Sequence, residues 1–82
     1  MKLKQFQHVE VTWEDATSHS GWHDEDSCDL ELQECKTVGY VYRVTKRSLQ
    51  LAPTKAASSE LADMWAIPRA CITRIRVIRG SR

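Results

Sequence analysis

Two imidazoles and two thiols lie within a stretch of 17 residues: His19, His23, Cys28 and Cys35. These side chains are the usual ligands of closed tetrahedral zinc sites. However, six residues separate the two cysteines, more than in an ordinary zinc knuckle. We therefore expect no metal, with zinc on these four residues as the alternative.

Catalysis finds little support in the residue pattern. Either cysteine could pair with a nearby histidine, but the surrounding acidic residues disfavour the thiolate that acts as the nucleophile. Glu14 and Asp15 are adjacent on an expected strand end, so their side chains point in opposite directions. The chain has only three scattered glycines and no glycine-rich phosphate loop. We therefore expect no enzyme and no cofactor.

Arginines and aromatic residues offer a stronger indication of binding. Arg74 and Arg76 share one side of the expected last strand, and guanidinium groups bind phosphate oxygens well. Tryptophans and tyrosines can stack on bases. The alternative is that the aromatic residues form the core and the arginines only face solvent. The predicted ligand-binding residues are Trp13, Asp15, Trp22, Arg43, Arg74 and Arg76.

Charge is divided unevenly along the chain, although the net charge is only +1. Residues 1–35 contain nine acidic and two basic residues, a net charge of −7, whereas residues 36–82 contain ten basic and two acidic residues, a net charge of +8. Such opposite charges favour attraction within a fold or between subunits. Two solvated faces are the alternative reading.

Alternation of apolar and polar residues predicts four short strands: 8–13, about 37–45, 48–52 and 72–79. The second and third are separated by Lys46 and Arg47, which indicates a hairpin. Acidic and turn-forming residues over about 16–36 predict a long loop, with Trp22 as an anchor.

The segment between the third and last strands is less regular. Ser58 and Ser59 are candidate caps for one or two turns of helix that end near Trp65. Residues 66–68 are expected to be extended because proline disfavours helical geometry in the residue before it. A single tight turn then follows at 69–71, and residues 80–82 form a frayed tail.

Together these segments predict an all-β fold: one domain over residues 1–82, a bent barrel of about five strands with a long first loop and a short helical turn before the last strand. With 41% hydrophobic and 28% charged residues, the composition is that of a soluble globular protein. So small a core favours oligomerisation. The expected core is Val9, Val11, Trp13, Val38, Tyr40, Tyr42, Val44, Leu49, Leu51, Ile67, Ile75 and Val77.

The chain resembles a family of small, largely uncharacterised phage-encoded proteins. The resemblance rests on Trp13-Glu14-Asp15-Ala16, Trp22, Thr37-Val38-Gly39-Tyr40 and Ile67-Pro68-Arg69-Ala70-Cys71-Ile72, and it covers most of the chain. It implies an SH3-like or Sm-like barrel rather than a particular activity. The loop between Trp22 and Thr37 is longer and more acidic than the family pattern.

These observations lead us to expect a non-enzymatic phage binding protein, a homo-oligomer that captures a phosphate-bearing ligand such as a host nucleotide signal. The alternatives are an interaction module whose acidic loop, with Asp24, Glu25 and Asp26, binds and inhibits a host protein, or a virion assembly component. No apolar run reaches the roughly 20 residues of a membrane span, and no signal peptide is evident. The expected location is the host cytoplasm.

Overall fold

The computed structural model describes residues 2–16 and 31–79 of the chain, and it is all-β, as expected. Its strands are β1 (His8–Asp15), β2 (Gln33–Val44), β3 (Ser48–Ala52), β4 (Thr54–Lys55), β5 (Leu61–Ala62), β6 (Trp65–Pro68) and β7 (Ile72–Val77). One turn of 3₁₀ helix, η1 (Arg69–Cys71), joins β6 to β7, which confirms the tight turn expected there.

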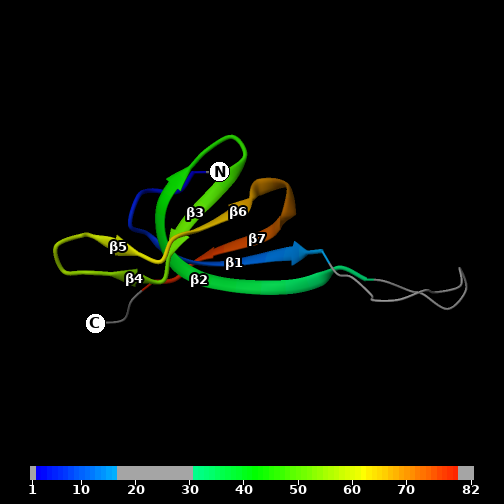
Figure 1. The fold of residues 1–82 in the computed structure, drawn as a ribbon, viewed down its shortest axis with the longest axis horizontal. Helices are drawn as coiled ribbons and strands as arrows, with labels where there is room; N and C mark the ends of the chain where they lie inside the picture. The colour runs from blue at the N-terminus through cyan, green and yellow to red at the C-terminus, as the bar shows by residue number, and fades with distance from the viewer. Residues whose placement is uncertain (1, 17–30, 80–82) are drawn as a thin grey trace, which may run out of the picture.

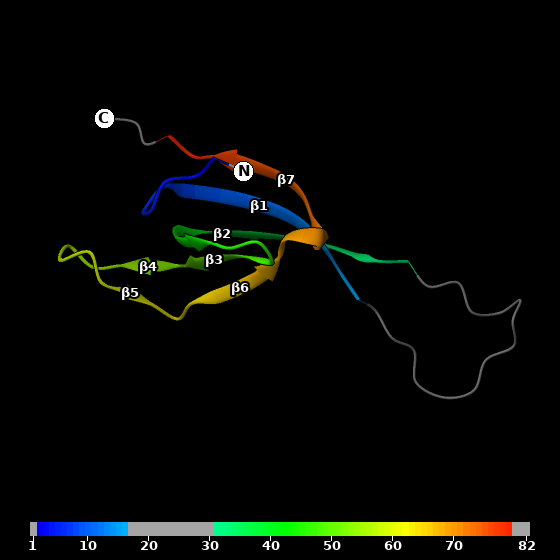
Figure 2. The same cartoon turned by 90° about the horizontal axis from the view of Figure 1, so that it is seen from above.

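Five strands form one antiparallel sheet in the order β6-β3-β2-β1-β7, while β4 and β5 pair separately (Figure 1). Figure 2 shows that the sheet is bent, with β6 and β7 as its two margins on either side of η1. These margins do not pair with each other in the described part of the chain, so the sheet is not closed and the prediction of a closed barrel is wrong. One margin is poorly suited to pairing, because β6 has four residues and its Pro68 lacks a backbone N–H.

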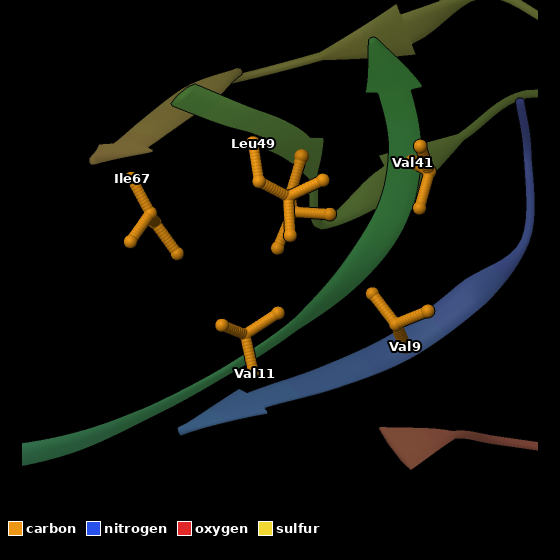
Figure 3. Close-up of a cluster of buried hydrophobic side chains, with 6 residues drawn as sticks. Val9, Val11, Val41, Leu49 and Ile67 are labelled. Carbon is orange, nitrogen blue, oxygen red and sulfur yellow. The ribbon is translucent and has the colours of Figure 1, made fainter. Parts of the chain in front are cut away.

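The core lies on the concave side of this sheet. Six side chains form the buried cluster, five of them expected from the sequence: Val9, Val11, Leu49, Leu51 and Ile67, with Val41 as the sixth (Figure 3). Trp13, Val44 and Ile75 pack against this cluster, which agrees with their expected core positions. Val38 and Val77 are wrong as core predictions, since they are 44% and 36% exposed.

The inward face of β2 is the opposite of the one predicted. Val38, Tyr40 and Tyr42 were expected to point into the core, but Gly39 and Val41 are the buried residues. Gly39 has no side chain, so the sequence shows no apolar residue at this buried position of β2, and the alternating pattern of the inward face is incomplete. A bulge between Val41 and Arg43 then shifts the register, and the shift returns Val44 to the core side.

The long loop is shorter than the predicted 16–36 because β2 begins at Gln33. Gln33 to Lys36 pair with the end of β1, from Asp15 back to Thr12, and so extend the two-stranded part of the sheet. The predicted anchor Trp22 and the predicted tail 80–82 lie outside the described residues.

The helix predicted from Ser58 and Ser59 to Trp65 is wrong. The chain instead forms the β4–β5 hairpin, in which the Ala56 N–H donates to the Glu60 carbonyl at 2.8 Å. Ser58 Oγ bonds the Glu60 carboxylate at 2.9 Å and caps no helix. So short a segment makes too few helical hydrogen bonds to offset the cost of helix nucleation. No helix in the described ranges is long and apolar enough to cross a membrane.

Candidate phosphate-binding surface

The convex face of the sheet carries the polar side chains of β1 and its two neighbours. Because Val9 and Val11 point into the core, the residues between and beside them point outward. Across β2 and β1 these outward residues form four pairs: Tyr40 with His8, Val38 with Glu10, Lys36 with Thr12, and Glu34 with Glu14. On the other side of β1, β7 places Arg76 beside Glu10 and Arg74 beside Thr12.

Three cations therefore surround the middle of β1: Lys36 from β2, and Arg74 and Arg76 from β7. We call these three residues the basic patch. All three are exposed. Successive outward residues on a strand lie about 7 Å apart, so the patch is compact enough for one ligand to contact more than one cation.

Arg76 is held by the acid at the centre of this face. Its Nη2 lies 3.3 Å from Oε2 of Glu10, and its Nε lies 3.4 Å from Oε1. The hydrogen bond from Arg76 lowers the pKa of the Glu10 carboxyl, while desolvation acts in the opposite direction. The positive charges of Arg76, Lys36 and Arg74 lower this pKa further, so the carboxylate senses all three cations.

Arg74 and Lys36 differ from Arg76 in having their donors available. Within residues 2–16 and 31–79, neither side chain makes a hydrogen bond or an ion pair. Both lie beside Thr12, whose side chain carries no charge. An arriving anion would therefore meet two unengaged cations and the remaining donors of Arg76.

An aromatic pair adjoins the basic patch on the same face. The rings of His8 and Tyr40 are stacked, with centroids 4.6 Å apart and planes inclined by 18°. Nζ of Lys55 lies 5.9 Å from the Tyr40 ring centre and 5.9 Å from that of Phe6, which places a fourth cation at this end. The face thus combines positive charge with an aromatic surface.

Of the predicted arginines, Arg74 and Arg76 come together but Arg43 does not join them. Arg43 lies seven residues beyond Lys36 on β2, about 20 Å along a strand. There its Cζ lies 4.9 Å from the Tyr42 ring centre, and its Nη2 donates to the Tyr42 hydroxyl at 3.2 Å.

Trp13 and Asp15 also lie away from the basic patch. The indole of Trp13 packs against the core and donates its N–H to Thr37 Oγ1 at 3.0 Å. Asp15 is exposed at the end of β1, where its Oδ1 accepts the Ala16 N–H at 2.8 Å. On this geometry Trp13 fastens β1 to β2, and Asp15 bonds the backbone where the loop begins.

Three of the four candidate zinc ligands, His19, His23 and Cys28, lie outside the described residues, as does Trp22. The fourth, Cys35, is half-buried on β2, with Sγ 3.7 Å from the Gln33 carbonyl oxygen. Among the residues the structure describes, no three histidine, cysteine or carboxylate side chains gather as a metal site requires.

Sequence reasoning did not single out Lys36 or His8 for this face. Lys36 fell within the predicted loop. Its position beside Arg74 follows only from the strand register, in which Thr12 pairs with Lys36 on β2 and with Arg74 on β7. Alternation along β1 does place His8, Glu10 and Thr12 on one face, which is a usable signal. The residues of β2 and β7 that lie beside His8, Glu10 and Thr12 can be identified only when the strand register is known.

The surface is open, since the described part of the chain contains no pocket. No protein-family model, no curated protein and no solved structure matches this chain, so the assignment of function depends on the geometry above.

Proposed function

We propose that this chain is a non-enzymatic binding protein that takes a phosphate-bearing ligand of the nucleotide class on the convex face of β2, β1 and β7. The basic patch of Lys36, Arg74 and Arg76 binds phosphate, and Tyr40 with His8 offers a surface for a base. The observation that carries the proposal is the clustering of three cations around Glu10, of which only Arg76 is ion-paired in the described part of the chain.

The chemistry of the side chains supports this assignment. A guanidinium presents several N–H donors in a planar fork, which matches the oxygens of a phosphate. The guanidinium of Arg74 makes no hydrogen bond or ion pair with the described residues, so its donors are available to a ligand there. Stacking on an aromatic ring contributes about 1 to 3 kcal/mol per base and tolerates any base.

We also propose an SH3-like or Sm-like fold and a phage origin for this chain. The order of the five strands and the 3₁₀ turn between the two margins are compatible with an open relative of an SH3-like or Sm-like barrel. With the resemblance to small phage-encoded proteins, this supports a role in binding a host nucleotide signal within the infected cell. In this proposal Tyr40 takes the stacking role that the sequence suggested for Trp13 or Trp22.

Calorimetric titration at low salt tests the proposal, with a short oligothymidylate, a cyclic dinucleotide and inorganic phosphate as probes. We expect at least one nucleotide probe to bind, and Arg74→Glu to weaken it about tenfold or more. Binding should also fall steeply as salt rises, because phosphate contacts release counterions.

The matched control is Arg47→Glu, which makes the same charge change on an exposed residue in the turn between β2 and β3. We expect it to retain most of the affinity. If no nucleotide probe binds, or if both variants weaken binding equally, the basic patch is not the site. Loss of a host protein from a pull-down after Asp24, Glu25 and Asp26 are changed to Ser, with no nucleotide bound, would favour the acidic-loop alternative.

A further inference from the structure

β2 has an unpaired edge along its first half. β3 pairs with β2 only from Tyr40 to Val44, whereas β1 pairs with it from Gln33 to Tyr40. In the described part of the chain, no strand therefore pairs with Gln33–Gly39 on the side away from β1 (Figure 1). Such an edge presents free backbone donors and acceptors to another strand.

The backbone bonds show which residues face this edge. The Val41 N–H donates to the Gln7 carbonyl at 2.8 Å, and this bond fits the register in which His8 is opposite Tyr40. Because bonding direction alternates along an antiparallel strand, the odd-numbered residues of this half of β2 bond to β1. The N–H and C=O groups of Glu34 and Lys36 then point to the unpaired side.

The side chains along this edge form a pattern that complements itself about Cys35. Glu34 and Lys36 flank Cys35 with opposite charges. Further out, Leu32 and Val38 are large apolar residues that are 62% and 44% exposed. A second copy running antiparallel about Cys35 would place each Glu34 beside Lys36 of the other copy, and each Leu32 beside Val38.

Neighbouring registers fit less well. A pairing centred on Lys36 would place two lysines opposite each other, and one centred on Glu34 would oppose two glutamates, both destabilising. The register about Cys35 also makes Glu34 and Lys36 a hydrogen-bonded pair. It leaves the two Cys35 residues as a non-hydrogen-bonded pair with Cα atoms about 4.5 Å apart.

The other margins of the sheet are poorer sites for a second copy. The Ile78 N–H donates to the His8 carbonyl, so the even-numbered residues of β7 bond to β1. The backbone N–H and C=O groups of Thr73, Ile75 and Val77 therefore point to the free side of β7. Two copies of β7 paired antiparallel would bring Arg74 and Arg76 of each copy together on one face, where they repel. The β6 margin is short and contains Pro68, which donates no hydrogen bond.

We infer that the free edge of β2 binds a second copy of this chain, antiparallel and centred on Cys35, to form a two-fold dimer with one continuous sheet. Opposite charges, exposed apolar residues and free backbone groups coincide at this edge. The interface is closed, since each copy presents the same surface to the other. This inference does not depend on the proposed ligand: in the dimer Lys36 is shared between the basic patch and Glu34 of the other copy, and the tests measure mass and covalent linkage only.

Charge reversal tests the register. The wild-type protein should sediment as a dimer, whereas Glu34→Lys or Lys36→Glu alone should raise the dimer dissociation constant about tenfold or more by opposing like charges. An equimolar mixture of the two variants should form a heterodimer, because each lysine then meets a glutamate. Native mass spectrometry identifies the heterodimer by its mass.

Matched controls are Glu60→Lys and Lys46→Glu, the same charge changes at exposed residues away from β2's edge. Both should remain dimeric, and circular dichroism should show that every variant is folded. A monomeric wild-type protein at its highest soluble concentration, or variants that stay dimeric alone, would overturn the inference. So would a mixture that yields no heterodimer.

Cysteine linkage gives a second readout with unaltered charges. In a variant with Cys28→Ser and Cys71→Ser, oxidised glutathione should link two Cys35 thiols into one disulfide, losing two protons while the glutathione disulfide is reduced to two thiols. We expect a covalent dimer that dithiothreitol reverses. A Cys71-only variant, Cys28→Ser with Cys35→Ser, should remain monomeric on a denaturing gel. Only glutathione-bound monomer from the Cys35 variant would contradict the proposed register.

Discussion

Arg76 of β7 and Glu10 of β1 lie opposite each other on the convex face, with Nη2 and Oε2 3.3 Å apart. This pair joins the edge strand β7 to its neighbour β1, and it engages one of the three cations of the basic patch. The side chain of Arg74, two residues earlier on β7, makes no hydrogen bond or ion pair in the described part of the chain. One arginine therefore contributes to the structure, while its neighbour keeps its donors for a ligand.

The Arg76–Glu10 pair should make stability depend on pH. The bond lowers the pKa of Glu10 below the ordinary value of 4.5, so its contribution is present above that value and is lost as pH falls through the folded-state pKa. Urea denaturation of the wild-type protein and Glu10→Gln should differ at neutral pH and converge in acid. A difference that stays constant from neutral pH down to about pH 3 would contradict this assignment.

Val41 and Val38 test which face of β2 is buried. Val41→Ala should lower the free energy of unfolding by about 2 kcal/mol, because Val41 is 1% exposed and its removal leaves a cavity. Val38→Ala should change it by less than about 0.5 kcal/mol, since Val38 is 44% exposed. Urea denaturation of dilute protein measures both. The reverse order would restore the face that the sequence first suggested.

Gly39 should not tolerate a side chain. A Cβ at this position would lie 2.9 Å from the Ala52 carbonyl oxygen and 3.2 Å from Cβ of Leu51. Gly39→Ala should therefore lower the free energy of unfolding by about 1 to 3 kcal/mol, as overpacking does elsewhere. Thermal denaturation next to the Val38→Ala control measures it. An unchanged melting temperature would mean that β2 and β3 can separate without cost.

Glu14 and Glu34 form a like-charged pair across β1 and β2. Neutralising one member, Glu14→Gln, should raise the free energy of unfolding by a few tenths of a kcal/mol at neutral pH and low salt. Salt at about 1 M should remove the gain, because it screens exposed charges. A gain that persists in high salt would point to a cause other than repulsion. Glu14 is preferred to Glu34 because it lies outside the proposed dimer edge.

The sequence predicts the strands with clear alternation well. β1 and β3 alternate between apolar and polar side chains, so their existence and buried faces were found. β7 was also found as a strand, but Ile75 is the only one of its two predicted core residues that packs against the core, since Val77 is exposed. The tight turn at 69–71 followed from the proline before it. These features depend on local residue preferences, which one sequence contains.

Features that depend on pairing were missed. The face of β2 was reversed because Gly39 hides the inward position and the bulge after Val41 changes the period. The β4–β5 hairpin was read as helix because its residues carry weak preferences. The basic patch could not be predicted without the strand register, because Lys36 and Arg74 lie on different strands and are brought near each other by pairing with the same residue, Thr12. Arg43 was grouped with the other arginines by residue type alone, and distance along β2 separates it.

Amide chemical-shift mapping tests the central claim most directly. A dinucleotide such as pTpT is added to labelled protein at low salt, and the amide shifts are followed by residue. We expect the largest changes at Thr12, Lys36, Arg74 and Tyr40, and their loss in Arg74→Glu. Changes confined to β6 and the β4–β5 hairpin, or no change at any concentration, would contradict binding at the basic patch.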